Sequence, residues 1–190
     1  MGDIEMEERP VIFTIGHSTR SLETFLQILK AYKVRVLVDV RKIPRSRHNP
    51  QFNQEIFSEK LNEAGYKYLH IPELGGFRRP KPDSRNLAWR SAGFRGFADY
   101  MESREFEESL EKLLKLATPG GVSIMCAEAF PWRCHRRLLS DALMIRGFQV
   151  EHILSLTKSQ PHRLHPSAKV EGGILTYPKG EGGDLRPNLI

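Results

Sequence analysis

The stretch VSIMCAEAFPWRCHRRLLSDALMIRG, residues 122–147, indicates the fold because it reads as a buried strand that passes through a short turn into a helix. The strand is the apolar run 122–125. The helix is indicated by apolar residues that recur on one face, namely Leu138, Leu139, Ala142 and Leu143. Pro131 suits the first helical position, where a backbone N–H has no partner. A strand followed directly by a helix is the repeating unit of an α/β protein.

The turn inside this stretch carries the reactive side chains. It holds both cysteines of the chain, Cys126 and Cys134, together with Glu128, His135 and Arg136. Residues four apart share a helix face, so Cys134 and His135 are expected in the first helical turn, in line with the apolar face. In an open α/β sheet that end of a helix lies beside the carboxyl ends of the strands, where ligands usually bind. The turn is therefore expected to form one wall of a site.

Length and composition limit the class of protein. The 190 residues are enough for one domain, or one domain with a tail. The net charge of +6, from 29 basic and 23 acidic residues, favours polyanionic partners. Two cysteines do not make a disulfide framework, so a reducing cytoplasm is the expected location. The polar start MGDIEMEERP is unlike a signal peptide, and no apolar run is long enough to span a membrane, so no membrane association is expected.

The rest of the chain alternates strands and helices. Strands are expected at 11–15, 34–40, 66–71, 122–125 and 149–156, and helices after Ser21, at 56–64, at 94–101 and at 106–117. These units predict an α/β fold with a mainly parallel central sheet of about five strands and helices on both faces. The expected core domain is 1–158. Residues 159–190, rich in Pro and Gly, are expected to form an extended tail on or near the core, with a short strand at 173–177.

Several separated motifs resemble one protein family. They are TIGHST at 14–19, DVR at 39–41, PRSR at 44–47, ELGG at 73–76, and CAE…P..CHR from Cys126 to Arg136. In this order they resemble the domain-of-unknown-function 488 family, over nearly the whole chain from Val11 to Tyr177. The resemblance implies a cytosolic α/β fold. It carries over no catalytic residue, because the activity of the family was not established.

Parallel strands would bring three groups of side chains to one edge. The first strand is followed by His17, the second by Asp39 and Arg41, and the fourth by Cys126. We take six residues as catalytic candidates, namely His17, Asp39, Cys126, Glu128, Cys134 and His135. Each has a structural alternative: a packing histidine, a buried Asp–Arg ion pair, or an inert core thiol.

The two thiols suggest nucleophilic chemistry, with Glu128 or Asp39 as acid or base. The first turn of a helix and its arginines would favour a thiolate at Cys134. No cofactor and no metal is expected. A mixed zinc site of the two cysteines, His135 and His17 is a weaker alternative, because the spacing is unusual. A phosphate-binding loop between Cys126 and Arg133 is also weaker, since the loop lacks glycine.

Two predicted loops are basic: 41–51 carries Arg, Lys and His without an acid, and in the stretch that starts with the loop 72–93 aromatics alternate with arginines. Arginine forks suit phosphate, and aromatic rings between them suit stacked bases. The candidate binding residues for phosphate or nucleic acid are Arg41, Arg45, Arg47, Arg78, Arg79, Trp89 and Arg136. Phe77 or Trp89 is the expected stacking ring. The alternative is that solvated arginines flank ordinary packing aromatics.

Two function classes follow. The first is an enzyme, such as a base-processing or repair-like hydrolase, that acts on nucleic acid or on another phosphate-bearing molecule. The second is a non-catalytic module that binds nucleic acid or a small anionic ligand, in which the cysteines and histidines are structural. The clustering of titratable groups favours the enzyme.

Overall fold

The computed structural model describes residues 9–117 and 121–180. Its centre is a six-stranded sheet in the order β3-β2-β4-β1-β5-β6. Five strands run parallel, namely β1 (Val11–Gly16), β2 (Val36–Asp39), β3 (Lys67–His70), β4 (Val122–Cys126) and β5 (Gln149–Ile153). The sixth, β6 (Ser159–Pro161), pairs antiparallel with β5. The predicted α/β fold with a mainly parallel sheet is confirmed, and β6 extends the sheet beyond the expected strands.

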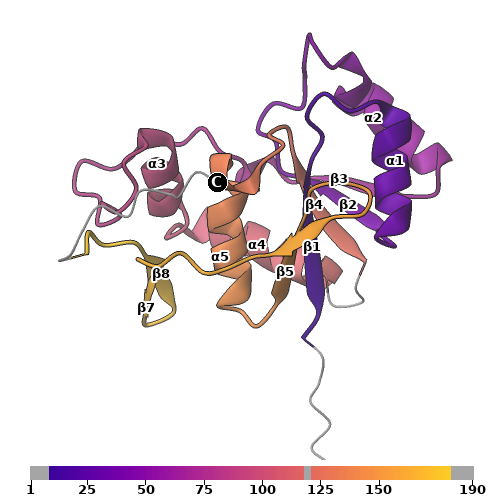
Figure 1. Cartoon of the computed structure of the whole chain (residues 1–190). Helices are drawn as coiled ribbons and strands as arrows, with labels where there is room; N and C mark the ends of the chain where they lie inside the picture. Colours follow the sequence, from indigo (N-terminus) through magenta and orange to yellow (C-terminus); the bar gives the residue numbers. More distant parts are fainter. Residues whose placement is uncertain (1–8, 118–120, 181–190) are drawn as a thin grey trace, which may run out of the picture.

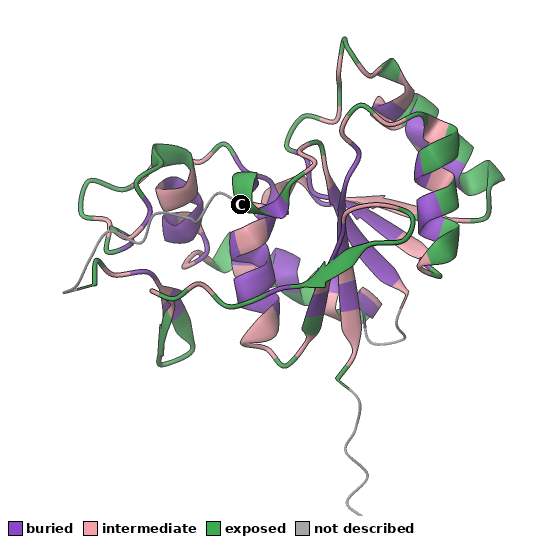
Figure 2. Cartoon of the chain, in the orientation of Figure 1, coloured by how far each residue is buried: buried purple, intermediate pink, exposed green. Residues whose placement is uncertain are grey.

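Helices cover both faces of the sheet (Figure 1). Helices α1 (Leu22–Ala31) and α2 (Gln54–Glu63) pack on one face, while α4 (Arg104–Ala117) and α5 (Arg136–Met144) pack on the other, with α3 (Ala92–Tyr100) beside α5. Successive strand residues point to opposite faces, so Ile15 is buried under α1 whereas Ile12 is buried on the α5 side. The strands and the inner sides of the helices are accordingly buried (Figure 2). None of the described helices is long and apolar enough to cross a membrane.

Local sequence signals explain the start of α1 and the end of α2. Ser21 caps α1, because its Oγ accepts a hydrogen bond of 3.1 Å from the N–H of Thr24. Gly65 follows α2 with a φ of 83°, a conformation that glycine adopts without strain. The helix after β4 starts later than predicted, because Pro131–Arg133 forms a separate 3-10 turn. Cys134 follows this turn in an extended conformation and therefore does not lie in the first turn of α5.

The predicted loop at 72–93 is held in place by one buried carboxylate. It contains a short 3-10 turn, Pro72–Leu74, and otherwise no regular structure. Asp99 of α3 accepts hydrogen bonds from the N–H of Lys81, the Oγ of Ser84 and the Nδ2 of Asn86. A carboxylate with three donors pins a loop that has few apolar residues to bury.

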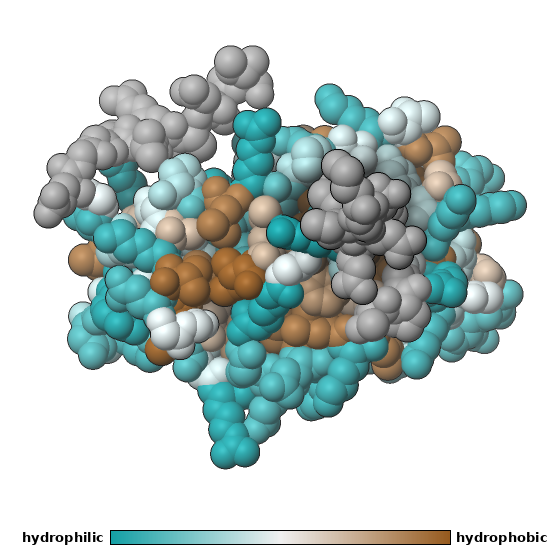
Figure 3. Space-filling view, turned by 90° about the horizontal axis from the view of Figure 1, so that it is seen from below, coloured by the Kyte–Doolittle hydropathy of each residue, from teal (hydrophilic) through white to brown (hydrophobic). Residues whose placement is uncertain are grey.

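The C-terminal segment folds onto the core. After β6 it forms a hairpin of β7 (Lys169–Glu171) and β8 (Ile174–Thr176), in the place where a short strand was predicted. Tyr177 is buried, and its backbone bonds to Ala88 and to the side chain of Asn86. The described part of the segment after residue 158 thus packs on the core through Tyr177. Seen from below, the molecule shows apolar groups among mainly hydrophilic ones (Figure 3).

Candidate functional site

The predicted catalytic residues gather at the carboxyl edge of the sheet, but they divide between its two faces. His17, Asp39 and Arg41 lie on the side of α1 and α2, where Phe52 and Tyr68 contact them. Cys126 packs on the opposite side, with the apolar residues that lie under α5. The polar groups thus form two neighbouring clusters above β1, β2 and β4.

The first cluster is built around a buried ion pair. The Nε of Arg41 lies 2.9 Å and 3.0 Å from the two carboxylate oxygens of Asp39, and its Nη2 lies 2.6 Å from Oδ2. Tyr68 donates its hydroxyl hydrogen to the same Oδ2 over 2.8 Å. Burial alone would lower the pKa of Arg41, but the hydrogen bonds and charge of Asp39 raise it. Asp39 is thereby committed to Arg41 and Tyr68, which fits the ion-pair alternative for these residues.

His17 joins this cluster as a neutral ring. Its Nδ1 lies 2.8 Å from the carbonyl oxygen of Ser18, so Nδ1 carries the proton, and Nε2 accepts from Arg41 Nη1 over 3.2 Å. Burial is the main cause that lowers the pKa of His17 to about 4. The hydrogen bond to Ser18 and the Asp39 carboxylate oppose this shift, and the positive charge of Arg41 adds to it. The ring also stacks on Phe52 with a centroid distance of 4.3 Å. His17 is therefore a hydrogen-bond acceptor for Arg41 at neutral pH.

The second cluster brings the two thiols and an imidazole together. One donor atom from each of Cys126, Cys134 and His135 lies within 4.8 Å of the other two. The Sγ of Cys134 is 3.6 Å from Nδ1 of His135. Cys134 is buried, whereas Cys126 is partly exposed at the end of β4. The three side chains of the turn after β4 that sequence analysis took as catalytic candidates thus lie side by side.

The surroundings of the thiols separate their proton affinities. A hydrogen bond to Cys134, together with burial, raises the pKa of Cys126. Burial alone would also raise the pKa of Cys134, but Cys126, Arg136 and His135 together hold it well below its usual value. The pair therefore favours one thiolate, on Cys134, that accepts a hydrogen bond from the thiol of Cys126.

Arg136 contacts the Cys134 thiolate from inside the protein, where a ligand cannot reach its side chain. Its Nε lies 3.4 Å from Cys134 Sγ, and its Nη2 donates to the carbonyl oxygen of Glu128. The side chain is buried, and its Nη1 lies 3.4 Å from Thr14 Oγ1. The predicted phosphate-binding role of Arg136 does not fit these contacts, because its donors are already used within the protein.

A buried chain of polar groups continues from Arg136, and sequence reasoning missed it. From Thr14 the contacts run to His152 (2.7 Å), His162 (2.9 Å) and the Oδ1 of Asp141 (2.8 Å). Tyr177 donates to the other oxygen of Asp141 over 2.8 Å. With one proton on each ring, every hydrogen bond from Arg136 to Asp141 runs in one direction. No periodicity marks these residues in the sequence, since they come from β1, α5, β5 and the segments after β6 and β8.

Glu128 occupies the loop after β4 and is partly exposed. Its Oε1 accepts a hydrogen bond of 3.2 Å from the N–H of Phe130. Its backbone lies against the end of β1, where a Cβ on Gly16 would be 1.9 Å from the carbonyl oxygen of Glu128. Gly16 is therefore required for the loops after β1 and β4 to meet.

The predicted phosphate-binding residues differ in their accessibility. Arg45, Arg47 and Arg79 are exposed. Arg41 is buried with Asp39, and Arg78 lies over the ring of Tyr100 at 3.5 Å. The exposed arginines remain candidates for contact with a ligand.

The prediction for Trp89 requires a correction. Trp89 is buried and packs on Phe94, His165 and Tyr177, because the C-terminal segment closes over it. It cannot stack on a base in this structure.

Three other aromatic side chains are exposed at the same edge as the thiols. Phe77 is 88% exposed and has a φ of 61°, which is unusual for a residue other than glycine. Its neighbour Gly76 packs on the ring of His135. Phe130 and Trp132 stack on each other at 4.8 Å and are also exposed. Sequence analysis missed the pair of Phe130 and Trp132, although its place shortly after a strand that ends in cysteine is a signal that the sequence offers.

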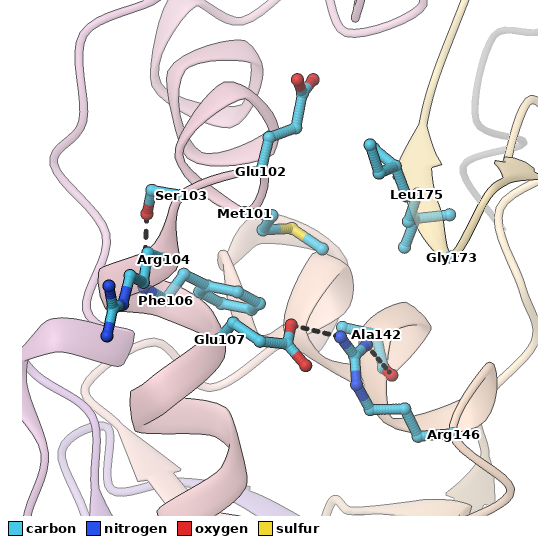
Figure 4. Close-up of a pocket in the computed structure, with 11 residues that line it drawn as sticks. Met101, Glu102, Ser103, Arg104, Phe106, Glu107, Ala142, Arg146, Gly173 and Leu175 are labelled. Carbon is cyan, nitrogen blue, oxygen red and sulfur yellow. Dashed lines mark hydrogen bonds and ion pairs between the residues drawn. The ribbon is translucent and has the colours of Figure 1, made fainter.

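A separate hollow of about 360 Å³ lies between α3, α4, α5 and β8 (Figure 4). It is lined by Met101, Phe106 and Leu175, and by the ion pair of Glu107 with Arg146. None of the predicted catalytic or binding residues lines it, so it is distinct from the candidate site.

Comparison with known proteins identifies the family but not an activity. No curated protein and no solved structure matches the chain. The model of the family described as domain of unknown function DUF488 matches residues 21–143, a range that includes Asp39, Arg41, both cysteines and His135. Because this match covers more than half of the chain, the protein belongs to the DUF488 family.

Proposed function

We propose that this protein is an enzyme that acts on nucleic acid or a nucleotide at the carboxyl edge of its sheet. Exposed arginines would bind phosphate, an exposed aromatic ring would stack on a base, and the Cys126–Cys134–His135 cluster would be the reaction centre. The proposal follows the usual position of ligand sites in open α/β sheets. Its substrate class is suggested by the net charge of +6.

The observation that carries the proposal is the position of Phe77. A ring that is 88% exposed gains nothing from burial, and its φ of 61° costs backbone energy. Strained backbone that persists at a surface position is concentrated at binding and catalytic sites. Phe77 lies between Gly76, which contacts His135, and the basic residues Arg78 and Arg79. A base stacked on Phe77 would therefore be held next to the reaction centre.

Binding can be tested with short single- and double-stranded DNA and RNA and with mononucleotides across a salt series. Phe77→Ala is expected to weaken binding by about 1–3 kcal/mol at every salt concentration, because stacking is not ionic. Arg79→Ala and Arg45→Ala should each lower the logarithmic salt slope, by about 0.7 on a single strand and about 0.9 on a duplex. The matched control is Lys30→Ala, because Lys30 lies in the last turn of α1, at the opposite end of the strands from the candidate site.

Catalysis needs a separate measurement. Each ligand that binds is incubated with the protein, and products are identified by mass spectrometry, with Cys134→Ser as the comparison. Turnover that is lost in Cys134→Ser supports the enzyme. Binding without turnover supports the alternative, a non-catalytic binding module. If no ligand binds even at low salt, or if Phe77→Ala changes nothing, the proposed substrate class is wrong.

A further inference from the structure

The Cys126–Cys134–His135 cluster has the donor set and the spacing of a metal site. A tetrahedral zinc ion, with Zn–S bonds of about 2.3 Å and Zn–N bonds of about 2.0–2.1 Å, separates a sulfur and a nitrogen ligand by about 3.6 Å. The Sγ of Cys134 and Nδ1 of His135 are 3.6 Å apart. The third donor, from Cys126, lies within 4.8 Å of both. Two adjacent residues can thus present ligands to one ion without rearrangement.

The two residues can do so because the backbone changes direction between them. Cys134 is extended, with φ of −128° and ψ of 147°, whereas His135 has the helical values of −57° and −17°. The 3-10 turn before Cys134 ends with a hydrogen bond of 3.1 Å from the N–H of Cys134 to the carbonyl oxygen of Pro131. Adjacent ligands would be awkward on one continuous helix, which the chain does not form here.

Apart from the contact of its Nδ1 with Cys134, the ring of His135 is positioned by packing. Its Nε2 is buried and has no hydrogen-bond partner, while Phe97 contacts the ring with a centroid distance of 5.0 Å. At Gly76 the absence of a side chain leaves room at Nδ1, since a Cβ there would lie 3.0 Å from it.

Arg136 would orient the sulfur of Cys134 as a ligand. Arg136 directs both its backbone N–H, at 3.5 Å, and its Nε, at 3.4 Å, to the Sγ of Cys134. Hydrogen bonds of this kind orient a ligating atom and tune the metal. Within the described residues no further Cys, His, Asp or Glu belongs to the group. His17 is not a fourth ligand here, because both its ring nitrogens are engaged with Ser18 and Arg41.

We propose that Cys126, Cys134 and His135 bind one zinc ion, with a fourth position left open to water or to an anionic ligand. Two sulfurs and one imidazole suit zinc better than the hard cations, which prefer oxygen ligands. Three protein ligands with an open position are the arrangement of catalytic zinc. A catalytic role for the ion rests on the proposed function, whereas the binding of the ion does not.

The direct test measures zinc on the wild-type full-length chain. The protein is stripped with a chelator under reducing conditions, mixed with zinc, and titrated against a chromophoric chelator. The expected result is one tightly held zinc ion per chain. Cobalt in place of zinc should give visible bands of a tetrahedral site and an ultraviolet sulfur-to-metal band. A wild-type chain that holds no zinc, gives an octahedral cobalt spectrum, or has its thiols joined in a disulfide after purification without oxidant overturns the inference.

Variants then assign the ligands. His135→Ala should weaken zinc binding by at least the roughly 10- to 100-fold that loss of an outer-shell group costs. Gly76→Ala should also weaken it, because its Cβ would lie 3.0 Å from Nδ1 of His135. Cys134→Ser should remove most of the sulfur-to-cobalt band. His48→Ala is the matched control, because His48 is exposed in the basic loop. Circular dichroism checks that each variant is folded. Oligonucleotide binding is measured separately, so zinc without oligonucleotide binding would leave this inference standing and reject the proposed substrate.

Discussion

Arg41 binds Asp39 through two of its nitrogens, with the shortest contact 2.6 Å from Nη2 to Oδ2. Asp39 is fully buried, and Arg41 is 5% exposed. The remaining donors of Arg41 reach His17 and the carbonyl oxygen of Phe52. The pair therefore ties together the loops that follow β1 and β2, and it fixes the edge of the sheet on which the thiols lie.

Replacing Asp39 by Asn should destabilise the protein strongly. The substitution keeps the shape of the side chain but leaves the Arg41 charge buried without a counter-ion, which costs about 3–5 kcal/mol. The measurement is the free energy of unfolding in urea. The matched control is Glu108→Gln, which breaks the exposed pair with Arg104 and should cost no more than about 0.5 kcal/mol. Equal losses in the two variants would show that the buried pair contributes no more than a surface pair.

The sequence predicts the layered fold well, because its signals are local. Apolar runs mark the parallel strands, and Ser21 and Gly65 mark helix ends by side-chain capping and by a positive φ. The start of α5 could not be predicted as well. Pro131 is compatible with an α-helix and with a 3-10 turn, and the extended conformation of Cys134 depends on contacts with Arg136 that no pattern reveals.

The candidate site could be predicted in part. That His17, Asp39 and Cys126 reach one edge follows from strand direction alone. Their division between two faces follows from alternation along each strand, once the strand ends are known. Burial of Trp89 could not be predicted, because it depends on Tyr177 and His165, which lie far away in the sequence. A sequence rich in Pro and Gly gives no sign that its backbone will close over a tryptophan.

Gly16 should not tolerate a side chain. A Cβ at this position would lie 1.9 Å from the carbonyl oxygen of Glu128, and backbone atoms cannot move aside cheaply. Gly16→Ala is therefore expected to lower the free energy of unfolding by more than about 3 kcal/mol. Gly93→Ala is the control. Gly93 lies in α3, where an added Cβ would have its nearest neighbour at 3.8 Å, so the free energy of unfolding should rise by roughly 0.5–1 kcal/mol. Similar stabilities of the two variants in urea would contradict the close approach at Gly16.

Tyr177 should stabilise the whole domain although it lies near the end of the described chain. Its hydroxyl donates to Asp141 over 2.8 Å in a buried site. Tyr177→Phe leaves that carboxylate oxygen without this donor and should cost about 1–3 kcal/mol in thermal or urea unfolding. The control is Tyr66→Phe. It loses only a contact to the carbonyl oxygen of Leu26 that is long, at 3.4 Å, and partly exposed, so it should cost less than Tyr177→Phe. An unchanged stability of Tyr177→Phe would mean that the C-terminal segment is only loosely attached.

His152 should make the protein less stable in acid. Burial, with smaller effects of His162, Arg136 and Arg137, lowers its pKa from 6.5 to about 3, while Cys134 acts in the opposite direction. The folded state thus holds His152 neutral, while the unfolded state takes up a proton below pH 6.5. The stability due to the neutral ring is complete above pH 6.5 and is lost as the pH falls towards 3, by up to about 1.4 kcal/mol per pH unit.

The variant His152→Gln isolates this effect, because a glutamine side chain takes up no proton in this range. His17 and His165 are also shifted downward and add to the acid dependence, so the informative quantity is the difference between variant and wild type. At pH 7 the variant should be less stable, since Gln cannot reproduce the bonds to Thr14 and His162. The difference in free energy of unfolding, measured in urea from pH 7 to pH 4, should shrink as the pH falls, because only the wild type loses the contribution of His152. His48→Gln is the matched control for removing a histidine from the surface. A difference that stays constant over the range would show that His152 is not held neutral by the fold.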